Sequence, residues 1–281
     1  MRVGDFEVRL INDGECRVDG GAMFGARPKT IWSRLVTSDA HNRVPLAINC
    51  LLIETPHKRI LVDVGIGAGT PSEFRDLHGL TGVKGMRRRI EEAGLKVDDI
   101  DIVLFSHLHY DHVDGALETV GGRKTPVFSR AEYVIQAGEW RDAFNTNKLT
   151  AGGYNEATLK ILEQTGRVRF IEGDVEVSPG VSVRVTGGHT VHHQIVIIES
   201  LGEKAVFLAD LIPTAAHLQP INISALDTNF LETFNAKSRL IREAVSEKIT
   251  CFFSHENDNV AGYVRRRGGG YVLEARQEKE T

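Results

Sequence analysis

A short cluster of metal-binding side chains constrains this chain more than any other feature of its sequence. Four such side chains lie within six residues, directly after the apolar run Ile102–Phe105, in the pattern His-x-His-x-Asp-His: His107, His109, Asp111 and His112. If that run is a strand, the turn after it can direct the two leading histidines to one ion and the other pair to a neighbouring ion. Single histidines are usually core or surface residues, but four ligands packed this closely rarely occur by chance. We therefore predict a metal centre at this strand end.

Short runs rich in apolar and β-branched residues predict β-strands throughout the chain. Several are nearly continuous apolar stretches, which is typical of strands that are covered on both faces. The predicted strands are Phe6–Ile11, Ile48–Glu54, Ile60–Val64, Ile102–Phe105, Val181–Val185, Ile195–Glu199, Ala205–Leu208 and Ile249–Phe253.

Helical patterns lie between these runs, over Lys84–Leu95, Asn155–Thr165 and Phe230–Lys248. The third pattern places a set of apolar side chains along one face of the predicted helix: Phe230, Phe234, Ile241 and Val245. Strands and helices interleave over the whole length without a linker or an internal repeat. We therefore expect a single α/β domain over residues 1–281.

Composition and charge narrow the class of protein. Of the 281 residues, 41% are hydrophobic and 26% charged, and the formal net charge is −4. This charge gives no reason to expect nucleic acid as a partner, and no apolar run reaches the roughly 20 residues of a membrane-spanning helix. The N-terminus has charges where a signal peptide has an apolar core. Cys16, Cys50 and Cys251 are far apart and odd in number, so we expect free thiols and a cytoplasmic protein without membrane attachment.

Three more candidate ligands occupy equivalent local positions. His189, Asp210 and His255 each follow an apolar run, so all three can meet the histidine cluster along one edge of a sheet. A catalytic zinc takes about three protein ligands and a water molecule, so seven ligands indicate two ions. His107, His109 and His189 are assigned to the first ion, and Asp111, His112 and His255 to the second, with Asp210 as the bridge. Zinc is the first choice of metal, with manganese, iron and cobalt as alternatives.

Weaker signals surround this set. Asp63 ends another buried run and is predicted to accept a hydrogen bond from a ligand histidine, and His193 is predicted to be a packing and hydrogen-bonding residue. His217 is close enough to Asp210 in sequence to act as a proton donor or substrate contact, the alternative being a histidine of a helix or loop. An apolar wall of the substrate pocket is predicted from a further group, for which surface packing or a dimer contact is the alternative: Met23, Phe24, Trp32 and Ile212.

In order and spacing, these residues resemble the five signature motifs of the metallo-β-lactamase superfamily. Asp63 matches the first motif, the cluster His107–His112 the second, and His189, Asp210 and His255 the remaining three. The resemblance implies a four-layer αβ/βα sandwich, in which two mixed sheets lie face to face with helices on the outer faces. Within the superfamily the chain resembles the quorum-quenching lactonase branch of the YtnP type, on stretches that include Asp19–Gly25, Gly187–His189 and Ala209–Thr214 followed by His217.

The function implied is hydrolysis of a small lactone or ester, such as an N-acyl homoserine lactone, by a hydroxide that bridges two metal ions. Asp111, Asp210 and His217 are the candidate catalytic residues. A phosphotriesterase of the methyl-parathion-hydrolase type is the main alternative, ahead of a thioesterase and a non-catalytic binding protein. Known lactonases carry a tyrosine shortly after the bridging aspartate, where this chain has Pro213 and Thr214. We expect a small-molecule substrate as partner, and a homodimer stays open.

Overall fold

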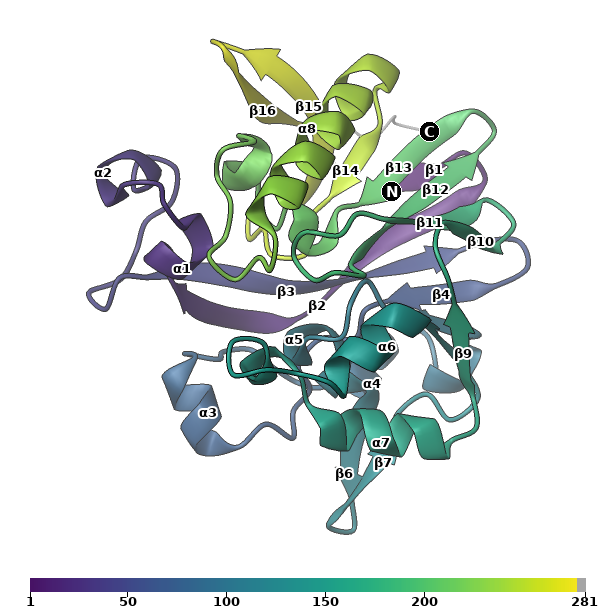
Figure 1. Cartoon of the computed structure of the whole chain (residues 1–281). Coiled ribbons are helices and arrows are strands. Elements are labelled where there is room, and N and C mark those ends of the chain that lie inside the picture. Colours follow the sequence, from purple (N-terminus) through teal and green to yellow (C-terminus); the bar gives the residue numbers. More distant parts are fainter. Residues whose placement is uncertain (277–281) are drawn as a thin grey trace.

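The structure is a computed structural model that describes residues 1–276, and its strands form two seven-stranded sheets (Figure 1). The first sheet has the order β1-β2-β3-β4-β5-β8-β9. Its pairs are antiparallel from β1 to β4 and parallel from β4 to β9. The strands are β1 (Arg2–Val3), β2 (Phe6–Asp19), β3 (Arg43–Glu54), β4 (Arg59–Val62), β5 (Ile102–Leu104), β8 (Glu132–Gln136) and β9 (Val168–Ile171).

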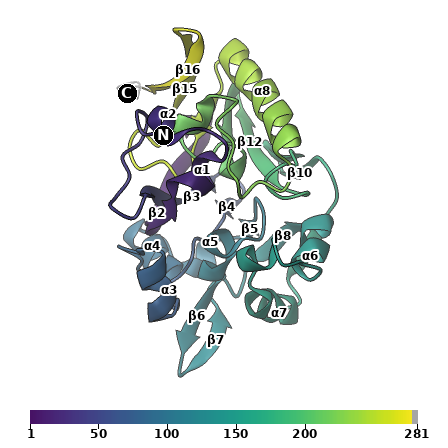
Figure 2. The same cartoon turned by 60° about the vertical axis from the view of Figure 1, so that its left-hand side comes forward.

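The second sheet follows the chain order from β10 to β16, and within it only the β13–β14 pair is parallel. Its strands are β10 (Val175–Ser178), β11 (Val181–Val185), β12 (Gln194–Ser200), β13 (Glu203–Phe207), β14 (Thr250–Phe252), β15 (Ala261–Arg267) and β16 (Gly270–Ala275). A separate hairpin of β6 (Leu117–Val120) and β7 (Arg123–Pro126) projects from the lower end of the molecule in Figure 2. Both sheets are mixed, as predicted.

Side-chain alternation along the strands explains why both faces of each sheet are covered. In β4, Ile60 and Val62 point into the apolar core between the two sheets, whereas Leu61 points to the opposite face. In the second sheet, Phe207 belongs to the core between the sheets, whereas its neighbour Val206 packs on the helical side. Strands covered on both faces need continuous apolar runs, which is the pattern from which these strands were predicted.

Helices on the outer faces complete four layers and confirm the predicted sandwich (Figures 1 and 2). The first sheet is covered by α4 (Met86–Glu92), α6 (Ala137–Ala143) and α7 (Glu156–Gln164), and the second by α8 (Phe230–Glu247). Shorter helices are α1 (Gly20–Phe24), α2 (Lys29–Trp32), α3 (Ser72–Leu77) and α5 (Tyr110–Val113). Within residues 1–276, no helix combines the length and the apolar character needed to cross a membrane.

The predicted apolar face of α8 differs from the buried face. Phe230 and Phe234 are 63% and 41% exposed, although Ile241 is buried as predicted. The side chains that join the apolar core on this side are offset around the helix, at Ala236, Leu240, Ile241 and Ala244, with the predicted Val245 partly buried against them. Small residues bring the helix close to the sheet, so the apolar spacing alone did not identify the face in contact.

Candidate metal centre

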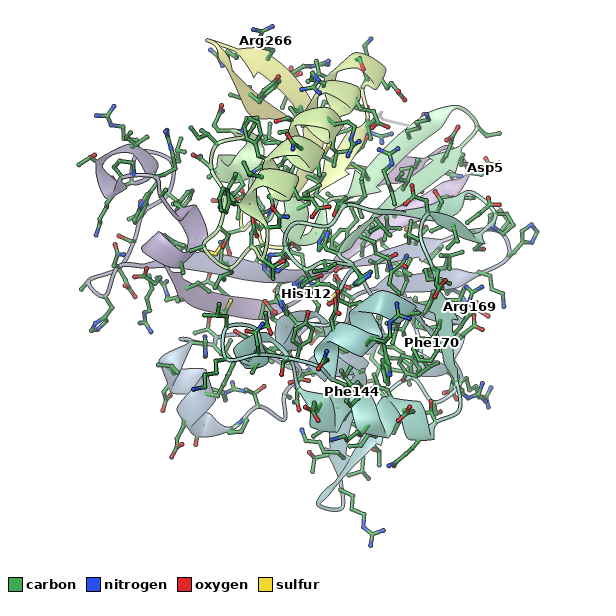
Figure 3. The ribbon with its side chains drawn as sticks, in the orientation of Figure 1. Asp5, His112, Phe144, Arg169, Phe170 and Arg266 are labelled. Carbon is green, nitrogen blue, oxygen red and sulfur yellow. The ribbon has the colours of Figure 1, made fainter. Side chains whose placement is uncertain are left out.

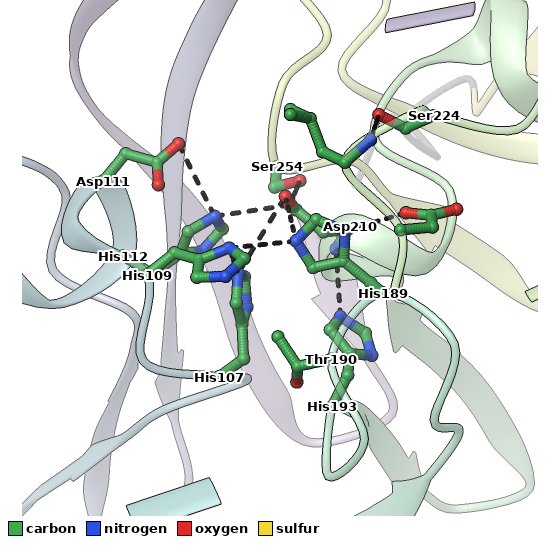
Figure 4. Close-up of polar contacts among 12 residues, drawn as sticks. His107, His109, Asp111, His112, His189, Thr190, His193, Asp210, Ser224 and Ser254 are labelled. Atoms are coloured by element: carbon green, nitrogen blue, oxygen red, sulfur yellow. Dashed lines mark hydrogen bonds and ion pairs between the residues drawn. The ribbon is translucent and has the colours of Figure 1, made fainter. Parts of the chain in front are cut away.

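Seven side chains from the two halves of the molecule converge at one place, and Figure 4 shows six of them, all except His255. The turn after β5 carries His107 and His109, and α5 carries Asp111 and His112, which Figure 3 shows near the middle of the molecule. The other three follow or connect strands of the second sheet: His189, Asp210 and His255. Every ligand predicted from the sequence therefore lies in the cluster, because each is placed just beyond a strand end.

The first group consists of three histidine rings whose nitrogens face one another. Nε2 of His107 and Nε2 of His189 each lie 3.1 Å from Nδ1 of His109. The ligand atoms of this group all lie within 4.8 Å of one another. Three nitrogens cannot all be satisfied by donating to each other, but three lone pairs directed at one point suit a divalent cation.

The second group lies on the other side of Asp210. Asp111 Oδ2 is 3.9 Å from Nε2 of His112 and 3.8 Å from Nε2 of His255. The side chain of Asp111 is 20% exposed, whereas the two histidines are buried. This group therefore combines two buried nitrogens with one carboxylate that solvent can reach.

Asp210 lies between the groups and directs one oxygen toward each. Its Oδ1 is 3.0 Å from His255 Nε2 and 3.3 Å from His112 Nε2. Its Oδ2 is 3.3 Å from His189 Nε2 and 4.0 Å from His107 Nε2. A carboxylate placed in this way can bind two ions at once, as predicted for the bridging ligand.

The electrostatics of the cluster fit cations. Burial alone would lower the pKa of His255, but Asp210 and Asp111 outweigh it and raise that pKa. Burial likewise opposes ionisation of Asp210, yet His255, His112 and His189 hold its pKa well below the usual range. Nε2 of His112 is buried and has no hydrogen-bond partner within the described chain. A metal-binding site combines carboxylates that are stabilised by positive charge with nitrogens that have no other partner, and this cluster has both.

In four of the candidate ligand histidines, the ring nitrogen that points away from the cluster, Nδ1, has a hydrogen-bonding partner. These partners hold each ring in one orientation. Asp63 has the predicted role, since its Oδ2 lies 2.8 Å from Nδ1 of His112. The other pairs are His189 Nδ1 with Asp227 Oδ1 at 2.9 Å, His255 Nδ1 with the Ala47 carbonyl at 2.8 Å, and His107 Nδ1 with Ser106 Oγ at 3.0 Å. Sequence analysis missed Asp227, because it lies in a polar loop and follows no strand.

Asp63 also fixes the turn that carries the cluster. It accepts hydrogen bonds from the Ser106 amide at 2.8 Å and the Ser106 hydroxyl at 2.7 Å. Its φ of 56° lies in the left-handed region, and Ala209, which precedes Asp210, has a φ of 44°. Left-handed backbone costs a non-glycine residue free energy and is often retained at functional sites.

His193 binds the backbone next to the centre but belongs to neither group of candidate ligands. Its Nε2 accepts a hydrogen bond from the Asp210 amide at 3.1 Å, and its Nδ1 lies 2.7 Å from the Thr186 hydroxyl. Burial and the nearby His189 lower the pKa of His193 to about 3, so the ring is neutral. The predicted packing and hydrogen-bonding role fits this arrangement.

The structure does not support His217 as a proton donor. The ring is buried, its Nε2 lies 2.9 Å from the Met23 carbonyl, and its Nδ1 lies 2.7 Å from the Thr214 hydroxyl. Burial and Lys237 lower the pKa of His217 to about 3. Phe24 stacks on it at 4.7 Å between ring centroids. With both nitrogens bound to neighbours, the ring has none free to protonate a leaving group.

The four predicted pocket residues also lie elsewhere: Met23, Phe24, Trp32 and Ile212 are all buried to 4% exposure or less. None of them lines the apolar cavity of about 390 Å³ beneath α5, whose walls include Ile66, Phe74, Leu117 and Ile161. This cavity adjoins the cluster through Tyr110, which precedes Asp111, and Tyr154, whose ring lies 5.0 Å from that of His109. The Gly-rich segment around Met23 therefore packs against the fold. The cavity walls include Tyr110 of the histidine cluster and Ile161 of the predicted helix Asn155–Thr165, neither of which was predicted to line a pocket.

Comparison with known families agrees with this geometry. Residues 43–248 match the family model described as the metallo-beta-lactamase superfamily. The chain belongs to this superfamily. Its members bind divalent metal ions, typically zinc, and the chain is a metal-dependent hydrolase.

Similar proteins include an N-acyl homoserine lactonase from Bacillus cereus, 28% identical over 79% of this chain and 86% of the relative. Among solved structures, a probable metal-dependent hydrolase from Staphylococcus aureus has a TM-score of 0.89, 28% identity and coverage of 99% and 100% of the two chains. AidC, a dizinc quorum-quenching lactonase, has a TM-score of 0.77, 21% identity and coverage of 100% and 97%. At that identity the likeness to AidC concerns the fold alone.

Proposed function

We propose that the chain is a binuclear hydrolase of small lactones or esters that resemble N-acyl homoserine lactones. The observation that carries this proposal is the placement of Asp210, whose two oxygens face different groups of histidines. A site for one ion would leave either the pair His112 and His255 or the pair His109 and His189 without a role. The seven side chains are accordingly assigned as ligands of two zinc ions.

When bound, two divalent ions would lower the pKa of a water molecule to about 7 and polarise the carbonyl group under attack. The protein contributes orientation and proton handling. Asp111 and Asp210 are 20% and 13% exposed, more than the ligand histidines that face them. Substrate therefore approaches from the side of the carboxylates, where Asp111, the more exposed of the two, is placed to accept a proton. Asp63 and Asp227 keep the rings of His112 and His189 in orientation.

The substrate class is supported by the surroundings of the centre. The adjoining cavity is lined by apolar side chains such as Ile66, Phe74 and Leu117, with the charged groups of Asp114 and Lys124, and is large enough for a short acyl chain. The Bacillus relative is an N-acyl homoserine lactonase that aligns over most of both chains. An uncharged lactone with an apolar acyl group agrees with both the cavity and the relative.

A second candidate follows from the residues near Asp210 in the sequence that could have supplied an acid. Pro213 and Thr214 stand where lactonases carry a tyrosine, and His217 has no free nitrogen. An alkoxide leaves poorly without protonation unless the ring-opened product holds it near a cation. Aryl phosphotriesters release a phenolate that needs no acid, so a phosphotriesterase is the alternative.

The test combines metal content with a substrate panel. We expect elemental analysis of zinc-supplemented protein to give two equivalents per chain, and N-hexanoyl homoserine lactone to be hydrolysed faster than p-nitrophenyl butyrate or diethyl p-nitrophenyl phosphate. Asp210→Asn should lower kcat/KM by far more than tenfold, which corresponds to about 1.4 kcal/mol. One equivalent or less would contradict the binuclear centre. Turnover of the phosphotriester without turnover of the lactone would favour the alternative.

A further inference from the structure

Beyond the ligands and their direct partners, one buried carboxylate contacts the segments that carry the whole first group. Glu139, on α6, is 1% exposed and was not identified from the sequence. Its Oε1 accepts hydrogen bonds from the Leu108 amide and the Tyr154 hydroxyl, both at 3.1 Å. Its Oε2 accepts one from the Thr190 hydroxyl at 2.7 Å. All three partners act as donors, so the side chain serves as an acceptor only.

Each partner of Glu139 adjoins a ligand of the first group. Leu108 lies between His107 and His109 in the chain, and Thr190 directly follows His189. These two segments come from opposite halves of the molecule. His189 and His109, which meet in the site, are 80 residues apart in the sequence. A carboxylate that binds both segments fixes their separation, and with it the distance between the three ligand nitrogens.

The third partner of Glu139, Tyr154, packs against the ring of His109. Within residues 1–276, His109 is the one ligand histidine whose far nitrogen, Nε2, has no hydrogen-bonding partner. Its ring is instead fixed by packing, with the Tyr154 ring edge-on at 5.0 Å and Gly153 against the other atoms. Because the Tyr154 hydroxyl is bound by Glu139, the orientation of His109 also depends on this carboxylate.

We propose that Glu139 is a positioning residue that sets the geometry of the His107, His109 and His189 site and thereby its metal affinity. The proposal rests on the proposed binuclear function and adds that one side chain, which contacts none of the reacting atoms, controls one of the two ion sites. Loss of an outer partner of a metal ligand typically lowers metal affinity on the order of 10–100-fold. A charged acceptor with three donors should lie at the upper end of that range.

Glu139→Gln is the main variant, because it keeps the volume of the side chain but leaves one acceptor oxygen where the carboxylate has two, for three donors. Tyr154→Phe removes the hydroxyl bond alone. Asp142→Asn is the matched control. Asp142 lies on the same helix as Glu139 and binds His192 at 2.9 Å, and His192 lies in the same loop as Thr190. Neither Asp142 nor His192 is next to a candidate ligand in the chain. Competition with a fluorescent zinc chelator should resolve two dissociation constants in the wild type and in the control.

We expect Glu139→Gln to raise one zinc dissociation constant about 100-fold and to leave the other within about threefold of the wild-type value. The absorption spectrum of bound Co²⁺ should change as well. Tyr154→Phe should raise the same dissociation constant by a smaller factor. The melting temperature of the metal-free variant separates positioning from folding. Unchanged zinc affinities in a folded Glu139→Gln protein would overturn the proposal, as would a melting temperature lowered without any change in affinity. If the wild type binds no zinc, the proposed function fails as well; if Glu139→Gln alone behaves as wild type, only the positioning role fails.

Discussion

Among single residues, Asp63 and Asp227 are a natural pair, because each binds the Nδ1 atom of a ligand histidine in a different group, at 2.8 and 2.9 Å. We expect Asp63→Asn to weaken the site of His112 and Asp227→Asn the site of His189, each on the order of 10–100-fold. Asparagine is preferred to alanine at position 63 because it tolerates the φ of 56°. Because Asp63 also binds Ser106, whose hydroxyl meets His107, chelator titration should show both zinc sites weakened in Asp63→Asn and only the site of His189 weakened in Asp227→Asn. Two weakened sites in Asp227→Asn would contradict this assignment.

His217 leads to a different expectation, since its contacts indicate packing. His217→Ala removes partners from the Met23 carbonyl and the Thr214 hydroxyl and leaves a void beside Phe24. Leaving a buried polar group unpaired costs about 1–3 kcal/mol, so the melting temperature should fall. The kcat values for alkyl lactones and p-nitrophenyl esters should fall by the same factor. A much larger loss on alkyl lactones, whose leaving group needs protonation, would restore His217 as the acid.

At the scale of secondary-structure elements, the loop Ala151–Gly153 before α7 approaches the centre closely. A Cβ added at Gly153 would lie 2.6 Å from the ring of His109, whereas one at Gly152 would meet nothing within 4 Å. We therefore expect Gly153→Ala to displace the His109 ring and lower zinc affinity at one site, with Gly152→Ala as a control from the same loop. Isothermal titration of the two proteins provides the comparison. Equal affinities would mean that the loop moves aside at little cost.

α8 buries a lysine that makes stability depend on pH. Burial lowers the pKa of Lys237 from 10.5 to about 7, and its Nζ donates a hydrogen bond to the Asn222 carbonyl. Between these two pH values the unfolded chain binds a proton that the folded chain does not, so stability increases as pH rises through this window. Relative to Lys237→Met, the wild type should gain melting temperature from pH 7 to pH 10. The exposed Lys160→Met on α7 should show no such trend, and a flat difference for Lys237→Met would contradict the burial effect.

The same helix shows which parts of the elements could be predicted. Apolar runs identified several strands that are covered on both faces, such as β4 and β13, but not β8, whose Tyr133 and Val134 are buried on opposite faces. The strand ends identified the seven candidate ligands, because a side chain just beyond a strand end can be found without knowledge of tertiary contacts. The packing face of α8 was missed because Ala236 and Ala244 contact the sheet while Phe230 stays exposed. Glu139 and Asp227 could not be found because their roles depend on contacts that are 15 to 51 residues away in sequence for Glu139 and 38 residues away for Asp227.

On the scale of the whole molecule, the centre lies between two halves that also meet through the apolar core between the sheets and through buried hydrogen bonds, such as that from Gln194 Nε2 to the Phe105 carbonyl. The segment His107–His112 follows the first sheet, whereas His189, Asp210 and His255 belong to the second. An ion held by both halves binds the folded chain and not the unfolded one, so it stabilises folding by RT ln(1 + [L]/Kd), about 2.7 kcal/mol at a hundredfold excess over Kd.

Removal of metal should therefore lower the melting temperature. Chains of about this size change by about 2–4 °C per kcal/mol, so chelation should lower it by about 5–10 °C, and zinc should restore it in a concentration-dependent way. Asp210→Asn is the informative variant, because it removes the bridge and leaves the apolar core intact. Its melting temperature should respond far less to zinc than that of Asp142→Asn. A response of wild-type size in Asp210→Asn would mean that one half of the molecule binds the ions alone, and that the centre does not connect the two sheets.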